Sequence, residues 1–221
     1  MCKNNMMLEF LIFSYFGITI DKAENFDAAL VASINRAYRD ASSHVLSIKN
    51  SKENENEKTP REVGSEIIFD TIKGLTDNQK EYDDVHTTLC CELVKQYDNK
   101  DYYKCYPERT FTYGIAQKWV NMTMKYIYMF HLIFNFGEFV DVTKKYEKYF
   151  HIPLDRYVFK ELKKEFGIKA EENFDKGAWS KIRIEEREKY NDLQEKIREK
   201  IPEAQSPLEW EHNAWIKSKR E

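Results

Sequence analysis

The spacing of hydrophobic residues predicts helices along most of the chain. The clearest case runs from about residue 25 to 48, where apolar positions recur every three or four residues and fall on one helix face: Phe26, Leu30, Ile34, Ala37, Ala41 and Val45. The same spacing predicts helices over residues 62–72, 78–97, 142–150, 155–167, 179–200 and 208–217. The pattern therefore predicts a mainly α-helical fold.

The stretch from residue 115 to 134 is the most apolar of the predicted helices. Large apolar side chains leave little of its surface polar: Trp119, Met122, Met124, Tyr126, Ile127, Phe130, Leu132 and Ile133. A helix that is apolar on almost every side is buried. We expect this helix to be the centre of a compact multi-helix domain, which makes its few polar residues the ones of interest.

A second apolar stretch lies near the N-terminus, from Met6 to Ile20. Glu9 interrupts it and no small-residue cleavage site follows before Asp21, which disfavours a targeting segment. It is also too short to cross a membrane. We expect a helix or strand of the core here.

Two polar segments separate the predicted helices. Residues 50–60 contain no large apolar side chain and predict an exposed polar loop, and residues 99–109 form a polar, aromatic connector in which Pro107 stops any helix. The sequence contains no internal repeat. We therefore expect one helical domain over residues 1–221, with a C-terminal pair of helices, residues 179–221, docked onto the core by Trp210 and Trp215. A partner-binding helix is the alternative for the last segment.

Composition and charge narrow the class of protein. The 221 residues are 42% hydrophobic and 33% charged with only 7 Gly and 5 Pro, which excludes collagen-like and disordered chains. A chain of this length buries a core without disulfides or metal. The net charge of −3 gives no overall attraction for nucleic acid, but residues 115–165 carry nine Lys and Arg against six Asp and Glu, a local excess that permits phosphate contacts.

The four cysteines, at 2, 90, 91 and 105, form no disulfide framework typical of secreted proteins. A reducing, cytoplasmic location is the simpler interpretation. His86 and Cys90 lie four residues apart, but neither a Cys pair nor a His pair at zinc-ligand spacing is present, so we expect buried thiols and no metal or other cofactor. Gly-rich phosphate loops, Gly-x-Ser-x-Gly elbows and His-Glu-x-x-His motifs do not occur.

Two segments combine into a candidate reaction site. Gly114 opens the central helix, whose first turns present Gln117, Lys118 and Asn121, and 37 residues after the lysine an apolar-Pro-apolar loop delivers Asp155 to the start of another helix. A lysine among apolar neighbours is desolvated, which lowers its pKa and favours the nucleophilic amine. A nearby carboxylate would stabilise a developing cation.

This combination resembles the helix-hairpin-helix superfamily of DNA base-excision glycosylases, in particular its 8-oxoguanine branch, over residues 111–160. The resemblance implies a lyase-type DNA glycosylase in which Lys118 attacks the sugar C1′ of a flipped nucleotide, Asp155 assists, and the backbone around Gly114 binds DNA. The chain departs from the family in having Thr112 where the first hairpin glycine stands and in placing its lysine four residues after Gly114.

A flipped base needs aromatic plates and polar groups that contact its edge. The candidates are Trp119 and Trp179 as plates, with Tyr113 and Phe111 as further aromatic choices, and Gln117, Asn121 or Gln194 as edge contacts. Arg156, next to Asp155, completes the predicted substrate-binding set. DNA is the expected partner, and no membrane contact is expected.

Each of these residues also has a structural interpretation. The Lys118 stem could pack on the core while its amine reaches solvent, Asp155 could be an ordinary helix cap, and most aromatic residues belong to the core. The competing class is a non-enzymatic helical binding protein. The two hypotheses differ in geometry, because an enzyme requires the Lys118 amine and the Asp155 carboxylate to line one open cleft.

A third possibility comes from Arg39 and His44. Their spacing resembles the Arg-x4-His pattern of HEPN ribonucleases, and this resemblance implies a metal-independent ribonuclease that uses the two as a catalytic pair. The structural alternative is a surface arginine and a histidine at a helix end, where it favours the helix dipole.

Overall fold

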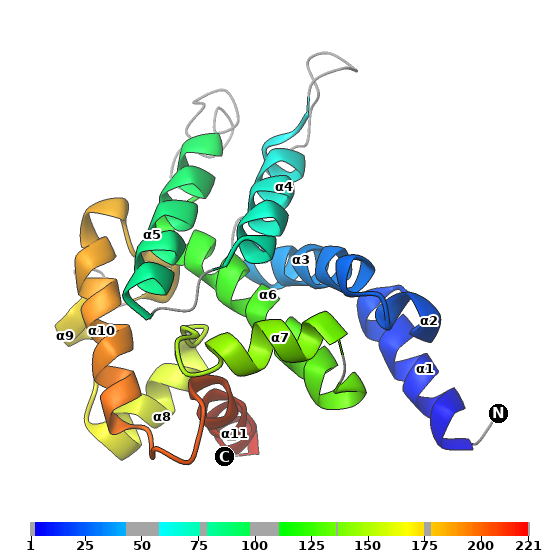
Figure 1. The fold of residues 1–221 in the computed structure, drawn as a ribbon. Coiled ribbons are helices and arrows are strands. Elements are labelled where there is room, and N and C mark those ends of the chain that lie inside the picture. Colours follow the sequence, from blue (N-terminus) through cyan, green and yellow to red (C-terminus); the bar gives the residue numbers. More distant parts are fainter. Residues whose placement is uncertain are drawn as a thin grey trace.

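A computed structural model describes residues 3–42, 58–75, 79–97, 111–135, 137–174 and 178–220. These residues are helical or irregular and contain no strand, which confirms the mainly α-helical class. The elements are α1 (Lys3–Phe16), α2 (Ile20–Ala23), α3 (Phe26–Ser42), α4 (Pro60–Lys73), α5 (Gln79–Gln96), α6 (Tyr113–Phe134), α7 (Gly137–Tyr146), α8 (Arg156–Phe166), α9 (Ala170–Asn173), two 3₁₀ turns η2 (Trp179–Lys181) and η3 (Ile184–Glu186), α10 (Arg187–Lys200) and α11 (Pro207–Arg220). Figure 1 labels the α-helices.

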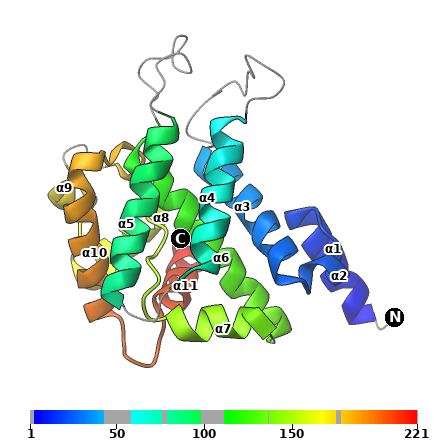
Figure 2. The same cartoon turned by 45° about the horizontal axis from the view of Figure 1, so that its top comes forward.

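The helix predicted over residues 115–134 is the centre of the fold, as expected. It is α6, and it packs against α3, α5, α7 and η2. Side chains on every face of its first four turns are buried, and Trp119 donates its indole N–H to the carbonyl of Ile34 on α3 at 3.0 Å. Figure 2 shows α4 and α5 side by side above α6, with α1 and α2 at one end of the molecule. The core therefore surrounds α6.

Local capping chemistry sets the ends of the helices around the site. Thr112 is the N-cap of α6, and its hydroxyl accepts a hydrogen bond from the Ile115 amide at 3.2 Å. Asn135 ends α6 in the left-handed conformation, at φ 48°. Asp155 is the N-cap of α8, and Gly167, at φ 72°, ends that helix, as the sequence predicted. These caps fix where α6 and α8 begin, and so where the Lys118 and Asp155 side chains project from the backbone.

Two predicted helices have different boundaries in the structure. The helix expected over residues 142–150 is α7, which begins at Gly137, because Phe139 packs against Phe26 and Phe130 and draws the earlier residues into the helix. The single helix expected over residues 179–200 is broken into η2, η3 and α10. Its break lies at Ile182, whose extended backbone lets a fully buried side chain dock beside the start of α6.

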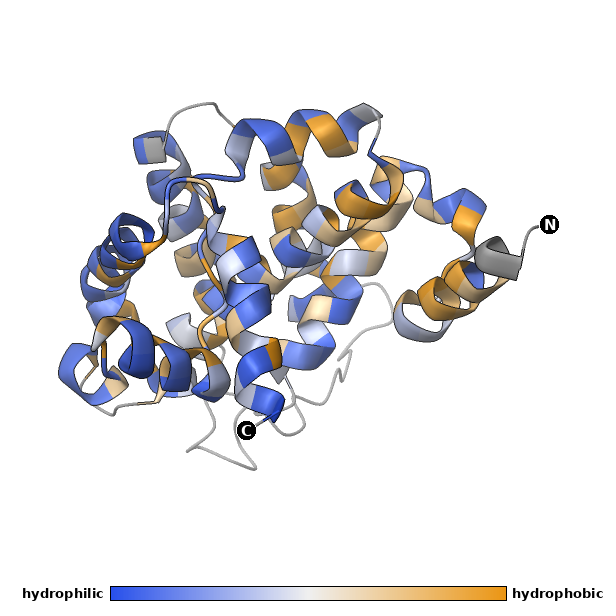
Figure 3. Ribbon diagram, turned by 90° about the horizontal axis from the view of Figure 1, so that it is seen from below, coloured by the Kyte–Doolittle hydropathy of each residue, from blue (hydrophilic) through white to orange (hydrophobic). Residues whose placement is uncertain are grey.

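The N-terminal apolar stretch is helical and belongs to the core on one side only, through Ile12 and the partly buried residues Leu8, Phe16, Ile18 and Ile20 that pack against it. Among the α1 side chains from residue 6 onward, only Ile12 is buried, whereas Met6, Met7, Phe10, Leu11 and Phe13 are all more than half exposed. The reason is that α1 packs on α2 and α3 along one side only, so its other apolar positions lack a partner among the described residues. Figure 3 shows this apolar helix standing away from the rest of the molecule. Among the described helices, none combines the length and the hydropathy needed to span a bilayer.

The C-terminal elements each bury one face. α10 buries Tyr190, Leu193 and Ile197, and α11 packs on α8, where the Trp210 indole donates to Glu165 at 3.1 Å. Several sequence predictions lie outside the described residues: most of the polar loop at 50–60, the connector at 99–109, the apolar position at Val45, and the thiols of Cys2 and Cys105.

Candidate functional site

Lys118 and Asp155 meet in the structure. The Lys118 Nζ lies 3.1 Å from Oδ2 of Asp155, although Lys118 belongs to α6 and Asp155 is the N-cap of α8. The other carboxylate oxygen of Asp155, Oδ1, accepts the amide hydrogens of Tyr157 and Val158, both at 2.9 Å. One oxygen therefore caps α8, and the other faces the amine.

Both side chains line the same open cavity, which is the geometry that an enzyme using this pair requires. The cavity has a volume of about 710 Å³ and lies between α1, α3, α6, α8, η2 and α11. Lys118, Met122, Lys125, Tyr126 and Met129 reach it from α6, because their spacing puts them on one helix face. The rest of its lining is Tyr15, Arg36, Asp40, Asp155, Arg156, Tyr157, Trp179, Glu211, His212, Trp215, Ile216 and Lys219.

We call Lys118, Asp155 and Trp179 the open cluster. The side chains of the ion pair are 7% and 15% exposed, so both charges are largely removed from water. Burial raises the pKa of Asp155, but the Lys118 ammonium and the two amide hydrogen bonds lower it more, and the net pKa is below its usual value. The Trp179 ring centre lies 5.6 Å from the Lys118 Nζ, close enough for a cation–π contact. The carboxylate is thus held ionised beside the amine.

A second ion pair lines the same cavity and was missed by sequence reasoning. Lys125 Nζ lies 2.6 Å from Oε2 of Glu211, and the Glu211 side chain is 1% exposed. Burial raises the pKa of Glu211 above its usual value, although Lys125 opposes this shift. Burial also lowers the pKa of His212, the next residue, to about 4. Lys125 lies seven residues after Lys118, a spacing that puts both lysines on the same helix face. The approach of Glu211 on α11 is a tertiary contact, which no local sequence signal indicates.

A third polar group closes the cavity on the side of α1 and α3. Arg36 pairs with Asp40 at 3.1 Å and lies over the Tyr15 ring at 4.1 Å. The Tyr126 hydroxyl donates to Asp40 and contacts the Tyr15 hydroxyl at 2.9 Å. The last turn of the apolar helix α1 therefore forms part of the wall.

Gly114 has a packing role. A Cβ built on it would lie 1.8 Å from the Trp179 carbonyl oxygen, so only glycine allows η2 to approach the start of α6 this closely. Its amide donates to the Ile182 carbonyl at 3.1 Å, which leaves that amide with no hydrogen for a DNA phosphate. The contact holds Trp179 in place over Lys118.

Gln117, Trp119 and Asn121 do not line the cavity. Trp119 is bound to α3, as described above, and Gln117 and Asn121 point from a different face of α6 into a buried polar network. Of the predicted substrate-binding residues, the structure brings only Arg156 and Trp179 to the cavity beside Lys118 and Asp155.

We call that buried set the closed network: His86, Gln117, Asn121, His151 and Tyr190. The Asn121 amide donates to Gln117 at 2.9 Å and to the Tyr190 hydroxyl at 2.8 Å, and its Oδ1 accepts from His86 Nε2 at 2.8 Å. The two imidazole rings lie 4.2 Å apart, centre to centre. None of these side chains is more than 2% exposed.

Burial keeps the closed network neutral, although its outer partners are charged. His151 Nε2 donates to Asp83 at 2.8 Å, and Asp83 also binds Arg198 at 2.7 Å. Burial lowers the pKa of both His86 and His151 below the usual value. The predicted edge contact Gln194 belongs here too, since it binds the amide and carbonyl of Ile152. Cys90 is a buried thiol 3.8 Å from His86, as the sequence predicted.

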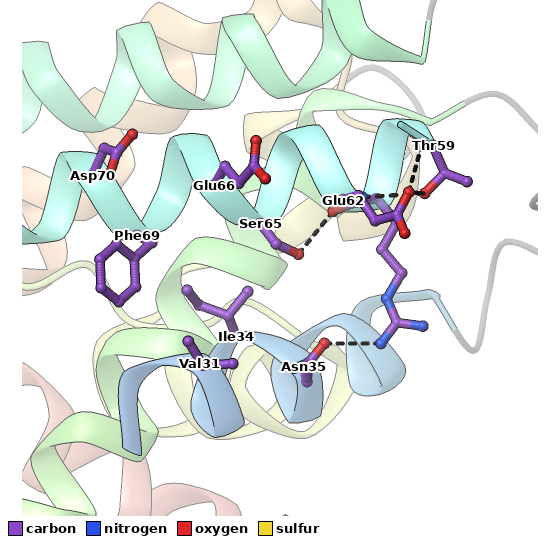
Figure 4. Close-up of a pocket in the computed structure, with 10 residues that line it drawn as sticks. Val31, Ile34, Asn35, Thr59, Glu62, Ser65, Glu66, Phe69 and Asp70 are labelled. Carbon is purple, nitrogen blue, oxygen red and sulfur yellow. Dashed lines mark hydrogen bonds between the residues drawn. The ribbon is translucent and has the colours of Figure 1, made fainter. Parts of the chain in front are cut away.

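A larger hollow, of about 970 Å³, lies between α3 and α4 (Figure 4). Its polar groups satisfy one another: Thr59 and Glu62 form a capping box, Arg61 donates to Asn35 at 3.0 Å, and Glu66 pairs with Lys58 at 2.7 Å. It contains neither a nucleophile beside a base nor a desolvated cation. Size alone therefore does not make it the candidate site.

The other proposed catalytic pair, Arg39 and His44, is described only in part. Arg39 is an exposed residue of α3, and His44 lies outside the described residues.

Comparison of the chain with known protein families, with curated proteins and with solved structures gave no match. The geometry of this chain is therefore the basis for a function.

Proposed function

We propose that this protein is a DNA glycosylase-like enzyme of helix-hairpin-helix type, which removes a modified or damaged base through a Schiff base on Lys118. The observation that carries the proposal is the 3.1 Å contact between the Lys118 amine and the Asp155 carboxylate in the wall of an open cavity. Lysine and carboxylate side chains at this distance are the pair that such a reaction requires. The partner is DNA.

The reaction follows from the two groups. The ammonium of Lys118 first gives a proton to the Asp155 carboxylate beside it, and the free electron pair on Nζ attacks C1′ of the flipped nucleotide. The bond from C1′ to the base nitrogen breaks, and its electrons leave with the base, which takes up the proton from Asp155. The bond from C1′ to the ring oxygen O4′ then breaks as a second proton moves from Nζ to O4′, which opens the sugar ring and gives a protonated Schiff base between C1′ and Nζ. The ionised Asp155 stabilises the positive charge that develops at the sugar.

A purely structural role accounts less well for this arrangement. A lysine that only packs its stem on the core extends its ammonium into water, whereas the Lys118 side chain is 7% exposed. Desolvating two charges consumes most of what their attraction contributes, so a buried ion pair adds little net stability. Asp155 would cap α8 equally well without a lysine beside it.

The cavity also suits a nucleotide. Its volume of about 710 Å³ is within the usual range for small-molecule sites, roughly 300–1,000 Å³. Trp179 and Trp215 supply aromatic faces near the two lysines, and Met122 adds an apolar surface. A base that leaves the DNA stack needs such surfaces in exchange.

Borohydride trapping tests the proposal. The purified protein is mixed with DNA duplexes that carry an abasic site or one of a panel of modified bases, and borohydride reduces any Schiff base to a stable covalent adduct. We expect an adduct with the wild type and none with Lys118→Ala. Lys125→Gln is the matched control, because it removes an amine from the same helix and the same cavity, and we expect it to form the adduct.

Circular dichroism confirms that each variant is folded. Wild-type protein that is folded and yields no adduct on any duplex would overturn the enzyme proposal and leave the non-enzymatic helical binding protein. An adduct that persists in Lys118→Ala would assign the chemistry to another amine.

A further inference from the structure

Two cations and a tyrosine stand together in the cavity wall next to Asp155. Arg156 and Tyr157 are the first residues of α8, and Lys219 comes from the last turn of α11. Arg156 Nη2 donates to the Tyr157 hydroxyl at 2.5 Å, and Lys219 Nζ donates to the same oxygen at 2.9 Å. Because both nitrogens donate to the same oxygen, the distance between them cannot exceed the sum of these two hydrogen-bond lengths.

The Tyr157 ring holds both charges in place. The Arg156 guanidinium carbon lies 4.6 Å from the ring centre and the Lys219 Nζ lies 4.1 Å from it. Lys219 is also 5.2 Å from the Trp215 ring. Both cations are exposed residues that line the cavity, so a ligand can reach them from solvent.

These two positive charges are not neutralised by a carboxylate among the described residues. Lys217, two residues before Lys219, shows the contrast, since it pairs with Glu165 at 2.7 Å and with Glu161 at 3.4 Å. Like charges held this close repel each other unless an anion lies between them. Arg and Lys together with a hydroxyl group are typical ligands of a phosphate group.

We propose that Arg156, Tyr157 and Lys219 bind a phosphate of the DNA backbone directly beside the nucleotide that Lys118 attacks. This inference rests on the proposed function. Arg156 follows Asp155 in the chain, so when a sugar lies against the Lys118–Asp155 pair, the phosphate attached to that sugar reaches the two cations. The site also supplies the backbone contact that the paired amide of Gly114 cannot give.

The test measures DNA affinity without chemistry. The probe is a fluorescent duplex with a tetrahydrofuran abasic analogue, which keeps every phosphate but cannot form a Schiff base. A second duplex carries a neutral methylphosphonate in place of the phosphate on one side of the analogue, and a third carries it on the other side. Wild type is compared with the double variant Arg156→Gln and Lys219→Gln at several salt concentrations.

We expect the double variant to bind the unmodified duplex about tenfold more weakly, and its plot of log K against log salt to be shallower by about two, one for each cation. One of the two methylphosphonate duplexes should weaken binding by the wild type by a similar factor and leave the double variant unaffected, because the contact is already lost. The matched control is Lys163→Gln with Lys200→Gln. It removes the same charge at exposed positions that do not line the cavity, and should bind like the wild type.

Equal affinities of the double variant and the matched control would overturn the phosphate site, and so would a methylphosphonate effect of equal size in wild type and double variant. The trapping experiment is independent of these measurements. If the methylphosphonate effect is lost in the double variant but no adduct forms, the phosphate site stands and the glycosylase mechanism is overturned. If the adduct forms but the methylphosphonate effect does not depend on the two cations, the mechanism stands and the protein binds the DNA backbone elsewhere.

Discussion

Two polar clusters leave adjacent positions of α6 and differ in charge and in access to solvent. The open cluster, at Lys118, is charged and lines a cavity, whereas the closed network, at Gln117 and Asn121, is neutral within and sealed. Neighbouring positions on a helix point about 100° apart, so one residue step separates a site from a core. The role of a polar side chain in a buried helix therefore depends on the helix face that it occupies.

The partners account for the difference. Asn121 satisfies its amide with groups that are themselves buried and satisfied, which makes the closed network a rigid part of the core. Lys118 contacts a carboxylate and an aromatic ring, and all three side chains line the cavity. Substitutions can therefore change one cluster while leaving the other intact.

Replacing Asp155 separates its two roles. Asn caps helices about as well as Asp, so Asp155→Asn should keep the stability of α8, but it removes the negative charge beside Lys118. We expect Schiff-base trapping to slow by about 100-fold, the lower end of the range for a positioned acid–base group. Asp155→Ala should show the same loss and cost about 1 kcal/mol more in unfolding free energy, measured in urea. Unchanged trapping by Asp155→Asn would reduce Asp155 to a helix cap.

Replacing Asn121 should have the opposite profile. Asn121→Leu leaves the buried partners His86, Tyr190 and Gln117 short of hydrogen bonds, and we expect it to lower the free energy of unfolding by about 3 kcal/mol. The amount of adduct per folded molecule should stay near that of wild type, because the open cluster is untouched. A variant of normal stability would show that the closed network relaxes or takes up water.

Gly114 lets η2 approach α6 closely. This approach places Trp179 over Lys118 in the open cluster. In Gly114→Ala the new methyl group would meet the Trp179 carbonyl, and η2 must shift. We expect a loss of about 2 kcal/mol in urea unfolding together with weaker binding of abasic DNA. Gly74→Ala is the matched control, because its Cβ would meet only ordinary contacts, at 3.5 Å and beyond. Equal stabilities of the two variants would mean that η2 yields without cost.

The sequence predicted most of the helices and named Lys118 and Asp155 as candidates, but it left open whether the two side chains share a cleft. Helical periodicity located α3 and α6, and capping residues located the start and end of α8, because these signals are local. The pair was found through a resemblance that spans both segments, since periodicity alone does not bring two helices together.

What the sequence missed depends on tertiary contacts. The apolar pattern of residues 6–20 left helix and strand open and did not show whether a partner covers the segment. The charge pattern of residues 179–200 concealed the docking of Ile182. Glu211 and Lys219 join the cavity only because α11 packs on α8, more than forty residues away along the chain. Gln117 and Asn121 lie on the same turns as Lys118, and only the packing of α5 and α10 showed which face was sealed.

The smallest predicted effect is the response of the closed network to acid. His86 and His151 are buried and their pKa values lie below the usual value of about 6.5, which the unfolded chain retains. As the pH falls through about 6.5, the two histidines bind protons in the unfolded state but not in the folded state. Their contribution to the free energy of unfolding is therefore fully present above this pH and declines below it. Between pH 7.5 and 5.5 we expect urea unfolding to show a loss of about 1 to 2 kcal/mol. His86→Gln removes one of these titrating groups, and its stability should decline less over the same interval. A parallel decline in wild type and variant would assign the acid sensitivity to other groups, such as His212, and would leave the closed network without a measurable electrostatic signature.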